Sequence, residues 1–358
     1  MSKIKLYQKN GYVDIAGILD FAKRESLYFI FITGGRGTGK TFTTLKHMID
    51  TKSMFVYLRR KQNQVDIINK PEFSPFKPIS KMIKREIISN PVTKYNAGFY
   101  FGEWDSEKEK YIPSGEPICF SAGLTTIANL RSIGIVEDCK YLVYDEFIPE
   151  KQENAIKNEG LAFLNCVETI GRNRELSGGE PLVTICLANA MNIGNAIFDT
   201  LDLVDIADSM ELKNQSYRIL RDRGVLLVRL IDSPISAQKA NTSLYRLSKG
   251  TDFFDMSVRN YFAFEEKGNI RNLPFNEFVL CVVVSDLAIY RHKNGRIYYC
   301  STHISGATQS RYKDTDIERV RFKTEHPEIY SAYVFNELYF DRYATELKFK
   351  KIYTRGKR

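Results

Sequence analysis

The sequence of 358 residues contains no long apolar run. No stretch approaches the roughly 20 apolar residues that a helix needs to cross a bilayer. The first residues, MSKIKLYQKNGYVDIAGILDF, also lack the charged start, apolar core and small-residue cleavage site of a signal peptide. These absences predict a cytosolic protein without a membrane partner.

Patterns typical of metal-binding and disulfide-rich proteins are absent as well. The six cysteines include no C-x-x-C pair, most of them sit in apolar runs, and the four histidines have no metal-ligand spacing. Such cysteines are typical of small core residues rather than of disulfides or zinc ligands. The sequence therefore predicts no structural metal site.

The composition is that of a folded globular protein with a basic balance. Hydrophobic residues make up 43% and aromatic residues 13% of the chain, which is long enough for two domains. The formal net charge is +9 and the sequence pI is about 9.0. This balance favours a polyanionic partner such as nucleic acid, although similar values also occur in ordinary enzymes.

The clearest motif is GGRGTGKT, which matches the complete phosphate-loop pattern G-x-x-x-x-G-K-[ST]. It lies between a predicted buried strand at residues 28–33 and a predicted helix at 42–50. Glycines let backbone N–H groups converge on phosphate oxygens, and the helix N-terminus adds a positive dipole. Lys40 is expected at the β- and γ-phosphates of ATP and Thr41 at Mg²⁺. The predicted nucleotide-binding residues are Gly34, Gly35, Arg36, Gly37, Thr38, Gly39, Lys40 and Thr41.

A second motif ends the apolar run at residues 140–144. Asp145 and Glu146 follow it directly, as in a Walker B element. There the aspartate holds Mg²⁺, largely through water, and the glutamate orients and polarises the attacking water. An apolar run followed by Asp-Glu is common by chance, but downstream of a complete phosphate loop it predicts nucleotide hydrolysis.

Three further residues are candidates near this site. Asn189 ends a predicted strand at 181–188, where it could sense the γ-phosphate or simply terminate the strand. Arg172 and Arg174 follow a predicted helix at 159–170. They are either surface charges or, in an oligomeric ATPase, an arginine finger that reaches a neighbour's γ-phosphate.

Strands and helices alternate along the first two thirds of the chain, which predicts an α/β domain with an open, mostly parallel sheet. The basic residues 59–61 end a predicted strand at 54–58, where they could contact nucleotide or nucleic acid or be solvated. Residues 7–8 lie where many P-loop motors read adenine, and a solvated segment is as good an interpretation.

The domain prediction has three parts. Residues 1–231 form the P-loop domain, with an inserted antiparallel hairpin at about 88–120. Residues 232–252 form a partly helical linker. Residues 253–358 form a smaller α+β domain, with strands at 278–284, 287–290 and 296–300 and helices at 315–323 and 331–343.

Together these motifs resemble the DNA-packaging ATPases, or encapsidation proteins, of small, short-tailed, protein-primed phages of the phi-twenty-nine-like Picovirinae type. The order of elements matches over nearly the whole length. The closest stretches are GGRGTGKT, FVYLRR at 55–60, YDEFIPEK at 144–151, and GRNRE with CLANA at 171–175 and 186–190.

The resemblance implies a homopentameric ring at the portal, or connector, of an empty procapsid, where it pumps double-stranded DNA inward using ATP. It implies an ASCE-type ATPase domain, action in the host cytoplasm and absence from the mature virion, and it leaves open whether a packaging RNA links the ring to the portal. Arg172 matches the trans-acting finger better than Arg174, and Arg36 is expected to touch the γ-phosphate.

The resemblance further implies that the C-terminal domain is similar to an RNase H-type nuclease domain that has lost catalysis and binds nucleic acid. An active nuclease of this type needs several clustered acids to hold two metals. The first long strand of this domain is flanked by Asp286, with Glu265 and Glu266 upstream, and no convincing cluster of acids follows. The domain is therefore expected to be non-nucleolytic.

Other classes of function are weighed against this one. Another nucleic-acid-dependent P-loop ATPase, helicase-like, is the nearest alternative. A small-molecule kinase would not explain the basic balance, the second domain or Arg172. A non-hydrolysing, ATP-gated scaffold would not need Glu146.

Overall fold

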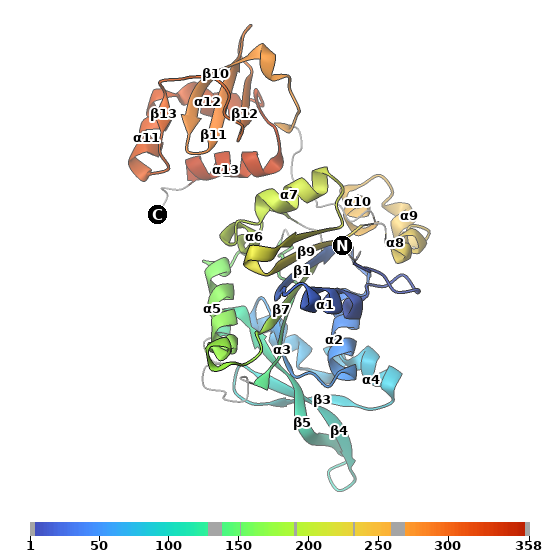
Figure 1. Cartoon of the computed structure of the whole chain (residues 1–358). Coiled ribbons are helices and arrows are strands. Elements are labelled where there is room, and N and C mark those ends of the chain that lie inside the picture. Colours follow the sequence, from blue (N-terminus) through green and yellow to red (C-terminus); the bar gives the residue numbers. More distant parts are fainter. Residues whose placement is uncertain are drawn as a thin grey trace. The chain divides into compact units, whose positions relative to one another are not determined.

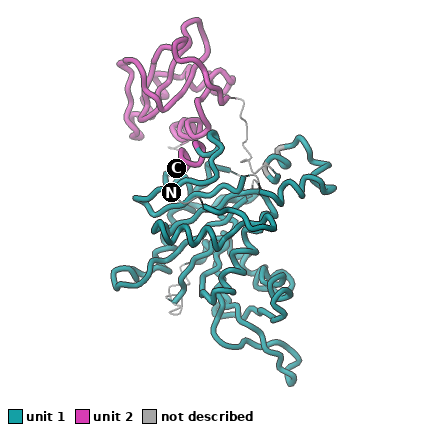
Figure 2. The backbone as a smooth tube through the Cα atoms, turned by 45° about the vertical axis from the view of Figure 1, so that its right-hand side comes forward, with its two compact units in different colours: residues 1–203, 210–263 teal, residues 204–209, 264–358 magenta. Residues whose placement is uncertain are grey.

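The computed structural model describes residues 4–127, 138–150, 152–189, 192–231, 233–258 and 269–354. The chain divides into two compact units (Figure 2): unit 1 comprises residues 1–203 and 210–263, and unit 2 comprises 204–209 and 264–358. Unit 1 thus extends past the predicted boundary at residue 253. Of the residues named above, Lys151, Ala190, Glu265 and Glu266 lie outside the described residues.

Unit 1 is built on a large sheet. Its strands are β1 (Phe29–Gly34), β2 (Phe55–Arg59), β3 (Ile87–Pro91), β4 (Ala97–Asp105), β5 (Lys110–Gly123), β6 (Tyr141–Asp145), β7 (Val183–Asn189), β8 (Tyr217–Leu220) and β9 (Val225–Leu230). They lie in the order β3-β4-β5-β2-β6-β7-β1-β9-β8 (Figure 1). Each pair of neighbours in the run β5-β2-β6-β7-β1-β9 is parallel. The predicted mixed α/β fold with a mostly parallel sheet is confirmed.

Helices cover both faces of this sheet, so its central strands are apolar on both sides. Along β1, Ile30 and Ile32 belong to the core that includes helix residues Phe21 and Met48. Phe31, which points to the other face, packs against aromatic rings that include Phe163. Figure 1 shows α1 and α2 on one side of the sheet and α5 on the other. The helices of this part are α1 (Ile15–Arg24), α2 (Lys40–Asp50), α3 (Gln62–Ile68), α4 (Lys77–Ile83), α5 (Glu159–Gly171) and α6 (Ala196–Thr200). Of α7 (Val204–Leu212), residues 204–209 belong to unit 2.

Strands β4 and β5 form the antiparallel hairpin that the sequence pattern indicates. The hairpin is continuous with the sheet, because the last residues of β5, from Cys119 to Gly123, pair in parallel with β2. Its outer part carries Trp104 and Tyr111, whose rings contact edge to face. The hairpin is therefore an extension of two sheet strands rather than a separate module.

Residues 234–258 form three short helices within unit 1: α8 (Pro234–Lys239), α9 (Ser243–Leu247) and α10 (Asp252–Val258). Helix α8 lies close to the chain's N-terminal segment, because a Cβ on Gly11 would come within 3.0 Å of Pro234 and Ile235 atoms. The segment that the sequence predicts as a partly helical linker is thus packed on the P-loop unit.

Unit 2 contains a five-stranded sheet in the order β13-β10-β11-β12-β14. Its elements are β10 (Phe278–Val284), β11 (Leu287–His292), β12 (Tyr298–Ser301), β13 (Arg311–Tyr312), α11 (Asp316–Glu325), α12 (Pro327–Val334), β14 (Leu338–Phe340) and α13 (Tyr343–Thr354). The RNase H-like character of this unit stays a prediction. None of the helices among the described residues of either unit is long and apolar enough to span a membrane.

The predicted helix at 331–343 is wrong. Helix α12 ends at Val334, Asn336 takes a left-handed turn conformation with φ of 58°, and β14 follows. Leu338 and Phe340 are buried on alternate positions of β14, which pairs in parallel with β12. A strand of three residues is too short for its period of two to stand out in the sequence.

Candidate active site

The phosphate loop connects the carboxyl end of β1 to the first turn of α2. Gly37 and Gly39 have φ of 74° and 85°, which L side chains rarely adopt. A Cβ on Gly39 would come within 2.7 Å of the Tyr12 ring, so glycine is also required sterically there. The loop therefore holds the backbone conformation that lets N–H groups converge on phosphate at the N-terminus of α2.

Lys40 is buried within this loop. Its Nζ donates to the carbonyl oxygens of Gly34 and Gly35, at 3.1 and 2.9 Å, and to Asn189 Oδ1 at 3.3 Å. Burial lowers the pKa of Lys40 to about 7, and the charge of Lys239 contributes in the same direction, against the raising effect of Asp145. Asn189 lies at the end of β7, between β6 and β1, where the sequence predicts a sensor.

Thr41 and Asp145 meet, as the two motifs predict. The Thr41 hydroxyl donates to both carboxylate oxygens of Asp145, at 3.0 and 3.1 Å, and the Tyr57 hydroxyl donates to Oδ2 at 2.7 Å. Burial and the nearby Asp145 charge raise the pKa of Tyr57, so the phenol stays a donor. The strands that carry Tyr57 and Asp145, β2 and β6, are direct neighbours in the sheet.

These residues fit Mg²⁺, which prefers oxygen ligands and commonly uses one or two protein groups together with phosphate and water. A hydroxyl and a carboxylate already lie within 3.1 Å of each other at the mouth of the phosphate loop. Among the residues that the structure describes, no cluster of three or more His, Cys, Asp or Glu could hold a metal by itself. A nucleotide-borne Mg²⁺ needs no such cluster.

Glu146 follows β6 with a positive φ of 55°, a conformation uncommon for residues other than glycine. Its side chain is half exposed and forms an ion pair with Arg59, which also contacts Asp145 at 3.1 Å. Arg59 thus spans both carboxylates from the carboxyl end of β2. The neighbouring Arg60 turns away from the site, because it is buried in an ion pair with Glu159.

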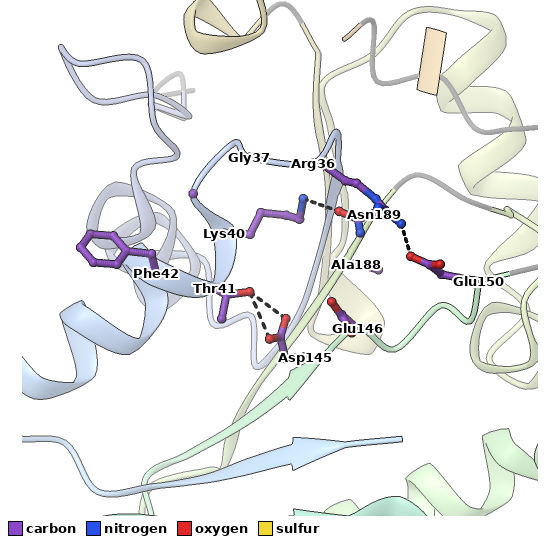
Figure 3. Close-up of a pocket in the computed structure, with 11 residues that line it drawn as sticks. Arg36, Gly37, Lys40, Thr41, Phe42, Asp145, Glu146, Glu150, Ala188 and Asn189 are labelled. Atoms are coloured by element: carbon purple, nitrogen blue, oxygen red, sulfur yellow. Dashed lines mark hydrogen bonds and ion pairs between the residues drawn. The ribbon is translucent and has the colours of Figure 1, made fainter. Parts of the chain in front are cut away.

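Arg36 projects from the loop and forms an ion pair with Glu150 (Figure 3). A cavity of about 370 Å³ lies between the loop and the two acids. Figure 3 shows its lining side chains converging from the loop, from the end of β6 and from the end of β7. The lining residues are Arg36, Gly37, Gly39, Lys40, Thr41, Phe42, Asp145, Glu146, Glu150, Ala188 and Asn189.

Arg172 and Arg174 lie near the amino ends of the central strands, opposite the carboxyl ends that carry the site. Both line a cavity formed with Tyr28 and Phe29, at the amino end of β1, whereas the phosphate loop follows its carboxyl end. Arg172 is exposed and ends α5 with φ of 44°. The structure therefore does not bring either arginine to the phosphate loop of the same chain.

Arg174 is held by hydrogen bonds at the end of α5. Arg174 donates to the backbone carbonyls of Gly171, Ile170 and Cys139 at 3.1, 2.8 and 2.7 Å. These bonds give Arg174 a structural role at the end of α5. The exposed Arg172 remains the candidate for a finger.

Tyr7 and Gln8 are not among the residues that line the site cavity. The Tyr7 hydroxyl donates to the carbonyl of Ile231 at 2.5 Å. In this N-terminal segment Tyr12 contacts the loop at Gly39, and the Val13 N–H donates to the Thr38 carbonyl oxygen at 3.1 Å.

Sequence reasoning missed Tyr57, Glu150 and Lys239 as residues of this region. Tyr57 looks like any buried strand residue, and Glu150 lies in an irregular segment, so no local pattern marks them. For Arg59 the sequence left two interpretations open, a contact with nucleotide or nucleic acid and a solvated charge. In the structure Arg59 contacts Asp145 of the site.

Comparisons with known proteins point to one family. A family model described as podovirus DNA encapsidation protein (Gp16) matches residues 21–321. A DNA packaging protein of Bacillus phage phi29 is 26% identical over 302 residues, covering 79% of this chain and 77% of that protein. A DNA packaging protein of Bacillus phage B103 is also 26% identical, over 300 residues. A solved structure titled the Phi-28 gp11 DNA packaging motor superposes with a TM-score of 0.52 at 19% identity, covering 92% of this chain and 95% of that one, which supports the fold.

Proposed function

The chain belongs to the podovirus DNA encapsidation protein (Gp16) family, and from that premise we propose that it is an ATP-hydrolysing motor subunit that moves double-stranded viral DNA into a procapsid. The relatives from Bacillus phages carry the name DNA packaging protein, which supports the DNA substrate. The net charge of +9 supports it as well, because a packaging motor must hold phosphate backbones irrespective of sequence.

The observation that carries the proposal is the meeting of Thr41, Asp145 and Glu146 at one cavity. Lys40 and the loop N–H groups would bind the phosphates of ATP. Thr41 and Asp145 would hold Mg²⁺, which supplies charge neutralisation on the phosphates when it is bound. A site that only binds nucleotide has no need for the second acid.

Glu146 is the residue we assign to hydrolysis. Its carboxylate would accept a hydrogen bond from the attacking water and align it with the γ-phosphate. Arg59 holds Glu146 and Asp145 together in this structure, so the arrangement of Glu146 depends on a residue of the neighbouring strand. Asn189, which accepts from Lys40, would report on the γ-phosphate through the same hydrogen-bond network.

The placement of Arg172 supports a ring in which one subunit completes the site of the next. An arginine at the amino end of the sheet cannot reach the phosphate loop of its own chain, since the length of β1 separates them. In a ring, Arg172 of one subunit would stabilise the charge on a neighbour's γ-phosphate. The pentameric number and the portal rest on the resemblance alone, which leaves a packaging RNA open.

We assign the C-terminal part of unit 2, residues 264–358, a nucleic-acid-binding, non-nucleolytic role on the same basis. Arg36, paired with Glu150 at the edge of the cavity, is assigned to the γ-phosphate, which would compete with Glu150 for the guanidinium.

Measurement of ATP hydrolysis with double-stranded DNA, with procapsids and with both tests the proposal. We expect the highest turnover with both present, and no turnover above background for Glu146→Gln, whose ATP affinity stays near that of the wild type. Equal turnover under all conditions would contradict a packaging motor. Transfer of phosphate to a small molecule would identify a kinase.

A further inference from the structure

Lys239, the last residue of α8, contacts the outer side of the phosphate loop. Its Nζ donates to the carbonyl oxygen of Arg36 and, at 3.3 Å, to the carbonyl oxygen of Ser257. A Cβ placed on Gly37 would lie 3.4 Å from the same Nζ, so the ammonium group is in contact with the loop backbone. No sequence motif includes Lys239, and it is not among the residues that line the site cavity.

The ammonium group of Lys239 has a third partner. It lies 4.7 Å from the centre of the Tyr245 ring, and Tyr245 is buried and stacks on Phe253 with ring centres 5.9 Å apart. Two carbonyl oxygens and an aromatic face compensate for the partial loss of water around a half-buried charge. The four contacted residues come from the loop, α9 and α10, so Lys239 joins the phosphate loop to the short helices of residues 234–258.

We propose that Lys239 is a positioning residue of the nucleotide site, which fixes the peptide between Arg36 and Gly37 for phosphate binding and couples nucleotide occupancy to residues 240–258. The proposal rests on the proposed function only in that the loop binds a nucleoside triphosphate. It assigns Lys239 no contact with the reacting atoms.

The geometry of one peptide unit gives the reason. In a trans peptide the C=O and N–H groups point in opposite directions. Because the carbonyl of Arg36 is held by Lys239, the N–H of Gly37 points away from Lys239. Arg36 and Gly37 both line the site cavity, whereas Lys239 does not. This N–H is therefore presented to a bound phosphate.

Glycine makes this peptide easy to rotate. Gly37 has φ of 74°, and a glycine can exchange between positive and negative φ at little cost. Rotation of the peptide would turn its carbonyl oxygen toward the phosphates, where it would repel them. The hydrogen bond from Lys239 opposes that rotation and favours the binding-competent conformation.

The same bond links the nucleotide to the short helices. A bound triphosphate holds the Gly37 N–H, which keeps the Arg36 carbonyl in place for Lys239. Lys239 in turn holds Ser257 and Tyr245. Nucleotide binding is then expected to stabilise residues 240–258, and the reverse must hold to the same extent, because coupling is reciprocal.

The test compares Lys239→Met with Lys239→Arg and with Lys249→Met, a control at an exposed lysine of the same segment. Affinity for Mg·ATP is measured by calorimetry on the full chain without DNA or procapsids, so the result is independent of packaging. We expect about tenfold weaker binding for Lys239→Met, the effect of one lost hydrogen bond from a charged group. Lys239→Arg should lose less, and Lys249→Met should match the wild type.

Hydrogen exchange separates positioning from a general loss of stability. In the wild type, a non-hydrolysable ATP analogue at saturation should slow amide exchange in residues 240–258, and in Lys239→Met it should not. Wild-type affinity for Lys239→Met, or undiminished protection by the analogue, overturns the proposal. If Lys239→Met fails to fold, Lys239→Ala, which also removes the hydrogen-bond donor, is judged by the same two results.

Discussion

The ammonium group of Lys40 is buried in the phosphate loop and has lost most of its contact with water. Its ammonium group donates to two carbonyl oxygens of its own loop and to Asn189, and burial brings its pKa down to about 7. A triphosphate would replace those neutral partners with anionic oxygens, which favour the charged form. The protonation of Lys40 is therefore linked to nucleotide binding.

This linkage gives a pH dependence. Above pH 7 the empty site loses the Lys40 proton and ATP binding restores it, so the affinity for Mg·ATP should fall by about tenfold per pH unit between pH 7.5 and 9. Calorimetry in two buffers of different ionisation enthalpy should show uptake of close to one proton per ATP. A pH-independent affinity with no proton uptake would contradict the linkage. Lys40→Arg, which stays charged, should show no such slope wherever it retains binding.

Whether a site residue can be predicted from the sequence depends on how far along the chain its partners lie. Lys40 and Thr41 could be predicted because phosphate binding needs a fixed local spacing, and Asp145 because it ends an apolar run. Tyr57 and Arg59 reach Asp145 only because β2 is the neighbour of β6. That neighbourhood is a property of the sheet order, which no short motif encodes.

At the scale of elements, helix α5 connects two regions of unit 1. At its start Glu159 pairs with the buried Arg60, which directly follows β2, and at its end the chain turns at Arg172. Arg174 fastens this end by donating to the carbonyl of Gly171, the last residue of α5, and to that of Cys139, which precedes β6. Arg174, which the sequence offered as the other candidate for the finger, thus fixes the position of the exposed Arg172.

The two arginines should separate in experiment. Arg174→Ala should lower the free energy of unfolding by about 2 kcal/mol, because three carbonyls lose a charged donor. Arg172→Ala should change it by less than about 0.5 kcal/mol, as expected for an exposed side chain, yet abolish most ATP turnover in assembled rings. Urea denaturation and ATPase assays on both variants check this. Equal destabilisation by both would remove the distinction.

Helices and strands with a long sequence pattern were predicted correctly, whereas the predictions failed for short ones. The central strands and α5 have apolar runs or helical spacing over five or more residues, and all appear in the structure. Strand β14 has three residues and was taken for helix, and β8, a strand of four residues at the sheet edge, was not predicted at all. The partly helical character of the segment with α8 and α9 could be expected, but neither α10 nor the contact with the phosphate loop through Lys239.

At the scale of the whole molecule, the proposed motor needs more than one chain. The phosphate loop, Asp145 and Glu146 lie at the carboxyl edge of the sheet in unit 1, and Arg172 lies at the amino edge. A closed ring of identical subunits brings one edge of each chain to the other edge of the next. Each site would then draw on two subunits.

Mixed rings test this directly. Glu146→Gln subunits bind ATP without hydrolysing it but keep Arg172, whereas Arg172→Ala subunits keep Glu146. Neither variant alone should turn over ATP, and mixing them should restore part of the activity, because some interfaces then pair an intact Glu146 with an intact Arg172. An absence of complementation in well-formed mixed rings would place the action of Arg172 within one chain or outside catalysis.

The central claim, that ATP hydrolysis at this site drives DNA packaging, is tested most directly by DNase protection. Wild-type protein, procapsids, Mg·ATP and double-stranded DNA are incubated together, free DNA is digested, and the protected length is measured. We predict genome-length protection for the wild type and none for Glu146→Gln or with a non-hydrolysable ATP analogue. Equal protection by Glu146→Gln, or ATP hydrolysis by the wild type without any protected DNA, would contradict the account.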